Sequence, residues 1–284
     1  MMIAWFRRPA AALLAVALGA TVLPCPVTAS AESNGGTRIM PLGDSITDGF
    51  ALPGGYRVAL WRSLADAGHL VDFVGSGYNG PAELADHDHE GHPGRRIDEI
   101  DAGVAGWIGS ASPRTVLLHI GTNDMVQNRD PANAPARLSA LIDRITAAAP
   151  DAELFVATII PLADPVLEAR AAAYNAAIPG VVRSRAAAGR RVHLVDMHAA
   201  VTVADLADGV HPGRAGYGRM AAAWHAALSS VPGSAGGPAA LRPARAVAPY
   251  AGSARRCRYD GPRGGPVAAR HAGRVIGMSG AEQV

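Results

Sequence analysis

The sequence contains no lysine, so arginine is its only basic residue. Residues 32–231 hold 16 arginines against 22 acidic residues, which gives this part of the chain a net charge of −6. Residues 232–284 hold eight arginines and two acidic residues, a net charge of +6. Because the main body is mildly acidic and offers no basic face to a phosphate backbone, we expect no nucleic-acid partner.

Long hydrophobic runs are also scarce. The apolar stretch at residues 11–23 is too short to span a bilayer, and it follows the basic pair Arg7 and Arg8. Small residues at Ala29 and Ala31 complete the pattern of a secretory signal. We predict that residues 1–31 are a removed signal peptide and that the mature protein is extracellular, without stable membrane association. A membrane anchor is the alternative.

Cysteine is the third scarce residue. Only two are present, and Cys25 would leave with the signal peptide, so Cys257 would remain alone. An intramolecular disulfide is then excluded in the mature chain. The fold must be held by its hydrophobic core, for which roughly 200 residues are ample.

Between residues 37 and 230, short apolar runs alternate with longer segments of helical spacing. The runs read as buried strands at 38–42, 70–74, 115–120, 153–159 and 191–196. The segments read as helices at 56–68, 97–108, 134–149, 165–189 and 215–230. This alternation predicts one α/β domain over 32–230, with a parallel sheet covered by helices on both faces.

Residues 231–284 differ in composition, since they are rich in Pro, Gly, Ala and Arg and show no periodicity. We predict a linker followed by a disordered tail. A translated frame-shift and a truncated accessory module are both compatible with this composition.

Polar motifs follow the predicted strands at the edge where parallel sheets bind ligands. They are "GDSIT" with Ser45, "HEGHPG" with Gly94, "GTND" with Asn123, and "DGVHP" with Asp208 and His211. Each motif alone is compatible with an ordinary turn or a helix cap. Their order and their common position favour a catalytic site.

These residue types supply what ester hydrolysis needs. Ser45 can be the nucleophile, His211 the base that takes its proton, and Asp208 the group that orients the histidine. The backbone N–H groups of Ser45 and Gly94 and the side-chain amide of Asn123 can bind the tetrahedral oxyanion. We also expect Ser45 to cap the helix that follows it. No metal or organic cofactor is required.

These motifs resemble the four sequence blocks of the SGNH hydrolases, the GDSL-type esterases. The resemblance covers residues 37–230, and the "GxSxG" motif of ordinary α/β-hydrolases is absent. It implies that Ser45, Gly94, Asn123 and His211 are the namesake residues, with Asp208 completing a triad. It also implies a flavodoxin-like, three-layer α/β/α fold with a five-stranded parallel sheet.

Further segments look like carbohydrate esterase family 3, whose known members are secreted acetylxylan esterases. These segments are "GGYR" (54–57), "VDFVGS" (71–76) and "LLHIGTNDM" (117–125). The likeness implies an esterase that removes O-acetyl groups from polysaccharide. Separately, we expect the protein to be a monomer. A lipase, lysophospholipase or thioesterase on the same fold is the alternative. A non-catalytic carbohydrate-binding protein is a further alternative, which the intact motifs disfavour.

Several nearby residues invite functional readings. We expect Asp44 and Asp124 to bond loop amides rather than transfer protons. Arg57 either holds the wall of the site or lies on a helix surface. His92 either lines the cleft or supports the residues that do. The acidic and histidine-rich residues 87–94 lack the spacing of a zinc motif and are expected to form a loop without a metal. Core packing is expected of His119, as a hydrogen-bonded histidine, and of Trp61, Trp107 and Trp224.

Overall fold

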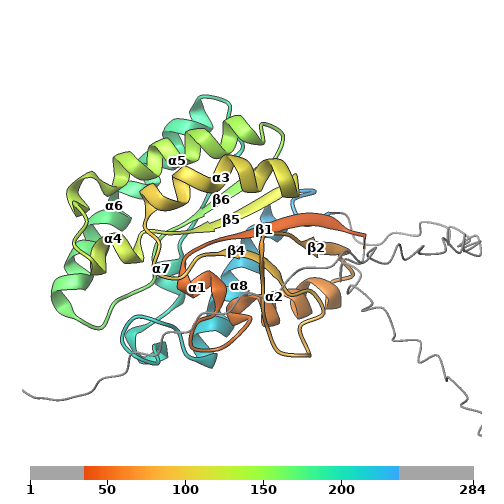
Figure 1. Cartoon of the computed structure of the whole chain (residues 1–284), viewed down its shortest axis with the longest axis horizontal. Helices are drawn as coiled ribbons and strands as arrows, with labels where there is room; N and C mark the ends of the chain where they lie inside the picture. Colours follow the sequence, from red (N-terminus) through yellow and green to blue (C-terminus); the bar gives the residue numbers. More distant parts are fainter. Residues whose placement is uncertain (1–34, 237–284) are drawn as a thin grey trace, which may run out of the picture. The chain divides into compact units, whose positions relative to one another are not determined.

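The computed structural model describes residues 35–236. The predicted signal peptide and almost all of the predicted tail lie outside these residues. The chain builds one mainly parallel sheet flanked by helices on both faces (Figure 1). The strands are β1 (Thr37–Gly43), β2 (Val71–Phe73), β3 (Gly77–Tyr78), β4 (Asp88–Gly91), β5 (Thr115–His119), β6 (Glu153–Ala157) and β7 (Val192–Val195).

The helices alternate with these strands, as the sequence predicts. They are α1 (Ser45–Asp48), α2 (Gly55–Asp66), α3 (Ile97–Ala111), α4 (Thr122–Val126), α5 (Ala134–Ala148), α6 (Pro165–Ala187), α7 (Met197–Ala200) and α8 (Arg214–Ser230). The five predicted helices correspond to α2, α3, α5, α6 and α8. The short helices α4 and α7 were not predicted, because a single turn shows no periodicity, and α1 was expected only as a helix after Ser45, without bounds.

The strand order is β3-β4-β1-β5-β6-β7, and β2 pairs with β1 as well. The five predicted strands are all present and mutually parallel. The predicted number of five strands is nevertheless too low. Strand β4 is parallel to β1 and pairs with it, and β3 is antiparallel to β4. Strand β4 lies within residues 87–94, so the expectation of a loop over that whole segment is wrong.

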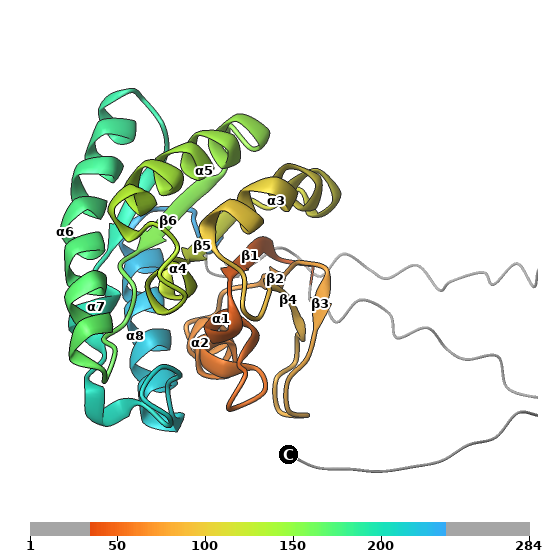
Figure 2. The same ribbon diagram turned by 60° about the vertical axis from the view of Figure 1, so that its left-hand side comes forward.

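Alternating side chains of each central strand enter different cores. On β5, Val116 and Leu118 pack with α3, α5 and α6, whereas Leu117 packs on the other face with α2 and α8. This is the period of two that a strand requires, and it produces the three layers visible in Figure 2. Trp61 and Trp224 are buried in the second core, as predicted.

Residues 231–236 pack against the domain, although the sequence placed them in the linker. Ser234 is fully buried, its Oγ donates to the Leu228 carbonyl over 2.7 Å, and its own carbonyl accepts from Thr115 Oγ1. Ala235 is buried in the core that α2 and α8 form with the sheet. The predicted domain end at residue 230 is therefore too early, because these contacts extend the folded domain to at least residue 236.

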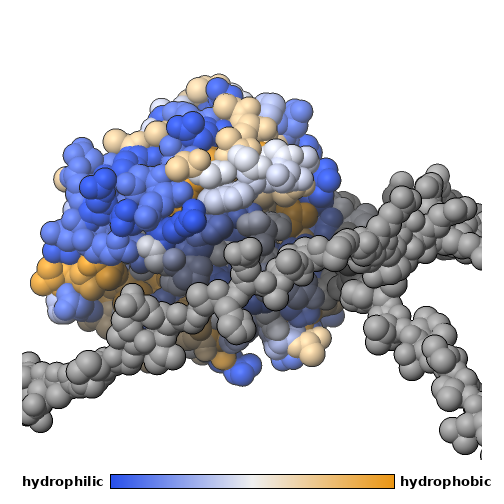
Figure 3. Space-filling model, in the orientation of Figure 1, coloured by the Kyte–Doolittle hydropathy of each residue, from blue (hydrophilic) through white to orange (hydrophobic). Residues whose placement is uncertain are grey.

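The surface is mainly polar on the face seen in Figure 3, with separate hydrophobic areas. Exposed large hydrophobic side chains include Phe50 and Val126, which both lie beside the site described below. Within residues 35–236, no helix has the length and apolar character needed to cross a membrane.

Candidate active site

Ser45 stands at the carboxyl end of the central strand. Strand β1 ends at Gly43, and the chain turns at once into the short helix α1, whose first residue is Ser45. The N-cap is Asp44, whose side chain accepts a hydrogen bond from the Ile46 N–H over 2.9 Å. The expectation that Ser45 caps the helix is wrong. Because Asp44 performs that function, the hydroxyl of Ser45 is left for another partner.

That partner is His211. Ser45 Oγ lies 2.9 Å from His211 Nε2, although 166 residues separate the two in the sequence. His211 Nδ1 lies 2.8 Å from Asp208 Oδ2. The three side chains thus form the hydrogen-bonded series of a nucleophile, a base and an orienting carboxylate.

Asp208 and His211 come from one short loop before α8. The second carboxylate oxygen, Asp208 Oδ1, accepts from the N–H groups of Val210 (3.0 Å) and His211 (2.7 Å). Partial burial on its own would raise the pKa of Asp208, but these bonds and the His211 side chain outweigh it and lower the pKa to about 2. The carboxylate is therefore ionised at any pH where the enzyme would work.

Gly94 and Asn123 line the same cavity as Ser45 and His211. Its volume is about 270 Å³, and its other walls are Phe50, Pro93, Thr122, Val126 and Val210. Gly94 has a φ of 77°, and a Cβ there would meet no atom within 4 Å. Glycine is thus required at this position by its left-handed backbone, rather than by crowding in the unliganded site.

The predicted oxyanion donors are held by three residues that the sequence analysis did not single out: Gln127, Arg96 and Arg95. The Gln127 side chain donates through Nε2 to the Gly94 carbonyl over 3.0 Å and accepts from Arg96 Nη1 over 2.6 Å. Asn123 Nδ2 donates to the Arg95 carbonyl over 3.1 Å. Gln127 lies four residues after Asn123, one helical turn further along. That spacing is the feature of the sequence that could have identified Gln127 as a neighbour of Asn123.

Asp44 and Asp124 both bond backbone amides, as predicted. Asp124 accepts from the Ile97 N–H over 3.0 Å and from Arg137 Nη2 over 2.9 Å, which ties α4 to α3 and α5. Burial raises the pKa of Asp44 to about 7, against the opposing effects of the Ile46 N–H and His211. Neither aspartate lines the cavity.

Arg57 is fully buried and is not a surface residue of its helix. Its guanidinium donates to the carbonyls of Asp48 and His87, and to the carbonyl and side chain of Asn79. Burial lowers its pKa to about 10, although Tyr56 and nearby acidic groups favour the charged form. The alternative of a surface residue is therefore wrong, and the predicted charge-assisted hydrogen bonds are present, but the residues that accept them do not line the cavity at Ser45.

His92 does not line the cavity, so of its two predicted places the structure shows the one behind the cleft. Its N–H donates to the Gly43 carbonyl, its Nε2 lies 2.7 Å from Glu90 Oε1, and its ring stacks on Trp107 at 4.3 Å. Trp107 is only partly buried, with the Arg95 guanidinium 5.8 Å above its ring, so the expectation of core packing is only partly met. Together these contacts fix the start of the Gly94 loop.

Two other histidines differ from expectation. His119 is fully buried, but neither ring nitrogen has a hydrogen-bond partner within residues 35–236, so it is not a bonded core histidine. Burial lowers its pKa to about 4. His89, on β4, is buried and accepts from the Gly91 N–H. In the same part of the chain, no group of three or more His, Cys, Asp or Glu side chains is arranged to hold a metal ion.

Comparison with known proteins agrees with this geometry. The profile of the GDSL-like Lipase/Acylhydrolase family matches residues 42–219, which span the motifs from Ser45 to His211. The chain belongs to this family, the SGNH hydrolases. The resemblance noted in the sequence is therefore confirmed, and so is the α/β fold with a mainly parallel sheet.

Solved structures of carbohydrate esterase family 3 are similar to this SGNH hydrolase. The Clostridium thermocellum family 3 carbohydrate esterase is 37% identical, with a TM-score of 0.63, over 68% of this chain and 96% of that one. The family 3 carbohydrate esterase from Talaromyces cellulolyticus is 32% identical, with a TM-score of 0.61, over 68% and 97%. This SGNH hydrolase is thus an esterase of the family 3 type.

A longer relative is also similar. The multidomain esterase of Ruminococcus flavefaciens is 32% identical over 237 residues, which are 74% of this chain and 30% of that protein. The SGNH hydrolase described here therefore spans less than a third of the length of this relative.

Proposed function

We propose that this esterase removes O-acetyl groups from a carbohydrate of the acetylxylan type outside the cell, through an acetyl-enzyme on Ser45. The proposal rests on the hydrogen-bonded series Ser45–His211–Asp208 beside a small cavity. Support comes from the likeness to family 3 carbohydrate esterases and from the signal-like sequence before residue 32.

In the first step, Ser45 Oγ attacks the acetyl carbonyl carbon while its proton passes to His211 Nε2. The negative charge of Asp208 stabilises the imidazolium that forms. The oxyanion accepts hydrogen bonds from the N–H groups of Ser45 and Gly94 and from Asn123 Nδ2, and each such donor is worth about 3–4 kcal/mol in the transition state. The bond from carbon to the sugar oxygen then breaks, and the sugar hydroxyl leaves with the proton from His211.

In the second step, water repeats the attack. His211 takes the proton of the water, the hydroxide oxygen bonds to the acetyl carbon, and the ester bond to Ser45 breaks. Acetic acid leaves and releases its proton to the solvent as acetate forms, and Ser45 recovers its proton from the imidazolium. No redox partner and no other reactant than water is needed for this balance.

The size of the cavity favours a short acyl group. Its volume of about 270 Å³ lies below the roughly 300–1,000 Å³ of sites that enclose drug-sized ligands. A long-chain lipid would require an acyl groove that extends from Ser45. Phe50 and Val126 are apolar and exposed at the cavity, so long-chain esters are the appropriate competing substrates in a test.

The test is acetate release from acetylated xylan by the full chain, with Ser45→Ala as the inactive control and acetyl and octanoyl synthetic esters as comparators. We expect release that disappears in Ser45→Ala and little octanoyl hydrolysis. Ser45-dependent cleavage of octanoyl esters without acetate release would move the substrate to lipids. Activity that survives in Ser45→Ala would remove Ser45 from the mechanism.

A further inference from the structure

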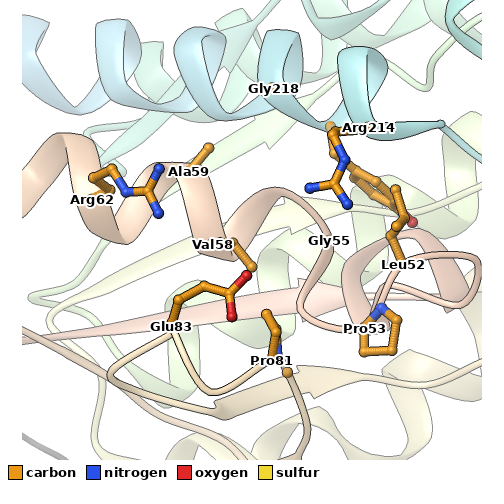
Figure 4. A pocket seen from close by; sticks show the side chains of 12 residues that line it. Leu52, Pro53, Gly55, Val58, Ala59, Arg62, Pro81, Glu83, Arg214 and Gly218 are labelled. Atoms are coloured by element: carbon orange, nitrogen blue, oxygen red, sulfur yellow. The ribbon is translucent and has the colours of Figure 1, made fainter.

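A second cavity, of about 570 Å³, lies between α2 and α8 and the chain that connects β3 to β4 (Figure 4). It is about twice the size of the cavity at Ser45. Neither the triad nor the oxyanion donors contribute to its walls. The wall residues on which the argument depends are Leu52, Val58, Arg62, Glu83, Arg214 and Tyr217.

Two short segments of chain connect the walls of this cavity with residues of the catalytic site. Arg214 follows His211 by three residues, so their Cα atoms are at most about 11 Å apart. On the opposite wall, the Phe50 ring lies 4.8 Å from the His211 ring, and Leu52 follows Phe50 by two residues. A polymer whose acetyl group reaches Ser45 can therefore place a neighbouring sugar unit in the second cavity.

The cavity carries an excess of unpaired positive charge. Arg62 and Arg214 are exposed and, among residues 35–236, neither has a hydrogen-bond or ion-pair partner. Most other arginines of the domain are paired, as Arg219 is with Asp205 on the same helix as Arg214. Glu83 is also unpaired within these residues, which leaves two guanidinium groups against one carboxylate. Figure 4 shows these three charged groups turned toward the space between them.

The rest of the wall suits a sugar ring. Leu52, Val58 and Pro81 provide apolar surface, and Tyr217, which is 3% exposed, also lines the cavity. Guanidinium groups match the geometry of a carboxylate and can bind it through two parallel hydrogen bonds. The cavity thus combines a surface for a ring with two free cations for an acid group.

We propose that this cavity is a subsite for a carboxylate-bearing sugar unit, such as a uronic acid, on the same carbohydrate that is deacetylated at Ser45. Arg214 and Arg62 bind the carboxylate, and the apolar wall packs against the ring. Glu83 limits the affinity for acidic ligands. The inference rests on the proposed function in one respect, that the substrate is a carbohydrate.

Binding is measured first, because it does not depend on activity. The full chain carrying Ser45→Ala is titrated calorimetrically with a xylo-oligosaccharide bearing one glucuronate branch and with the unbranched oligosaccharide of equal length. We expect at least about fivefold tighter binding of the acidic ligand. Arg214→Gln and Arg62→Gln should each weaken it about three- to tenfold, Glu83→Gln should strengthen it, and the neutral ligand should respond to none of them.

Arg183→Gln is the matched control, since Arg183 is an exposed arginine on α6 without a partner in the described part of the chain. It should leave both affinities unchanged. Equal affinity for the two oligosaccharides, or an equal loss in Arg183→Gln, would overturn the subsite.

The acetylated forms of both oligosaccharides then separate the two proposals. A higher kcat/KM for the acidic substrate that falls in Arg214→Gln supports both. A binding preference without any acetate release would remove the proposed function and leave the subsite. Acetate release at equal kcat/KM from both substrates, without a binding preference, would remove the subsite and leave the proposed function.

Discussion

Gln127 Nε2 donates a hydrogen bond to the carbonyl of Gly94 over 3.0 Å, across 33 residues of sequence. The same amide nitrogen lies 3.5 Å from Asn123 Oδ1, so one side chain contacts both residues that offer oxyanion donors from outside α1. The position of the two donors relative to each other therefore depends on a residue that does not line the cavity.

We predict that Gln127→Met lowers kcat about tenfold with little change in KM. A displaced donor loses part of the roughly 10²–10³-fold contribution that a whole donor makes to the transition state. Gln127→Glu is the informative partner, since its carboxylate can still accept from Arg96 but cannot donate to the Gly94 carbonyl. Steady-state kinetics on an acetyl ester decide the matter, and full activity in Gln127→Glu would show that the bond to Gly94 is dispensable.

Asp208→Asn should lower kcat by about 10²–10³-fold. A buried triad aspartate is worth about 10⁴-fold, and Asp208 is 48% exposed, so water can replace part of its effect. The asparagine keeps the size of the side chain, which separates the loss of charge from the loss of shape. Circular dichroism checks that the variant keeps the overall fold, and a loss below tenfold would contradict the role of Asp208 in orienting His211.

Arg57→Lys should reduce the free energy of unfolding by about 2–3 kcal/mol, because an ammonium group cannot reach all the acceptors that the buried guanidinium bonds. Urea denaturation measures the change. Arg62→Lys is the control on the same helix, since Arg62 is exposed and should change stability by less than about 0.5 kcal/mol. Equal effects of the two substitutions would contradict the structural role of Arg57.

His119 should make the protein less stable in acid. Its imidazole is neutral in the folded state down to about pH 4, whereas in the unfolded chain it takes up a proton below about pH 6.5. The unfolded state binds more protons in this window, so stability falls as the pH drops from about 6.5 to about 4. By about pH 4, the loss of unfolding free energy that is due to His119 approaches about 3 kcal/mol.

His119→Leu should therefore flatten the pH dependence of unfolding over that window. Urea denaturation at pH 7 and at pH 4 compares the variant with the wild type, and His69→Leu serves as a control at a partly exposed histidine. The difference between His119→Leu and the wild type should grow in favour of the variant as the pH falls. A constant difference would show that His119 is not held in the neutral form.

The sequence predicted those parts of the fold that depend on short-range patterns. The buried strands and the long helices reveal themselves by apolar periodicity, and the four motifs follow the strands that position them. Strand β4 could not be predicted, because "DHEG" has no apolar pattern. Its burial depends on distant partners, such as the bonds of Glu90 to Ser76 N (2.8 Å) and Oγ (2.7 Å).

In the site, too, residues with explicit chemistry could be predicted, whereas roles that depend on distant contacts could not. Ser45, Asp208 and His211 could be selected because their chemistry is explicit, and the structure brings them together. The N-cap could not be assigned between neighbouring polar residues, since Asp44 and Ser45 are both good caps and only backbone geometry distinguishes them. The role of Arg137 depends on its contact with Asp124, for which the spacing of 13 residues gives no signal.

Two different strands pair with β1 along one of its edges. Strand β2 pairs with Thr37–Ile39, and β4 pairs with Leu42–Gly43. The segment that connects β2 to β4 runs away from β1 and then returns to it. This connection carries Pro81 and Glu83 to the second cavity. Insertions or deletions in this connection need not shift β1, which ends at Gly43, two residues before Ser45. Substrate preference and catalytic chemistry can thus change separately, because part of the wall of the proposed subsite and the edge that carries Ser45 are attached to the sheet at different points.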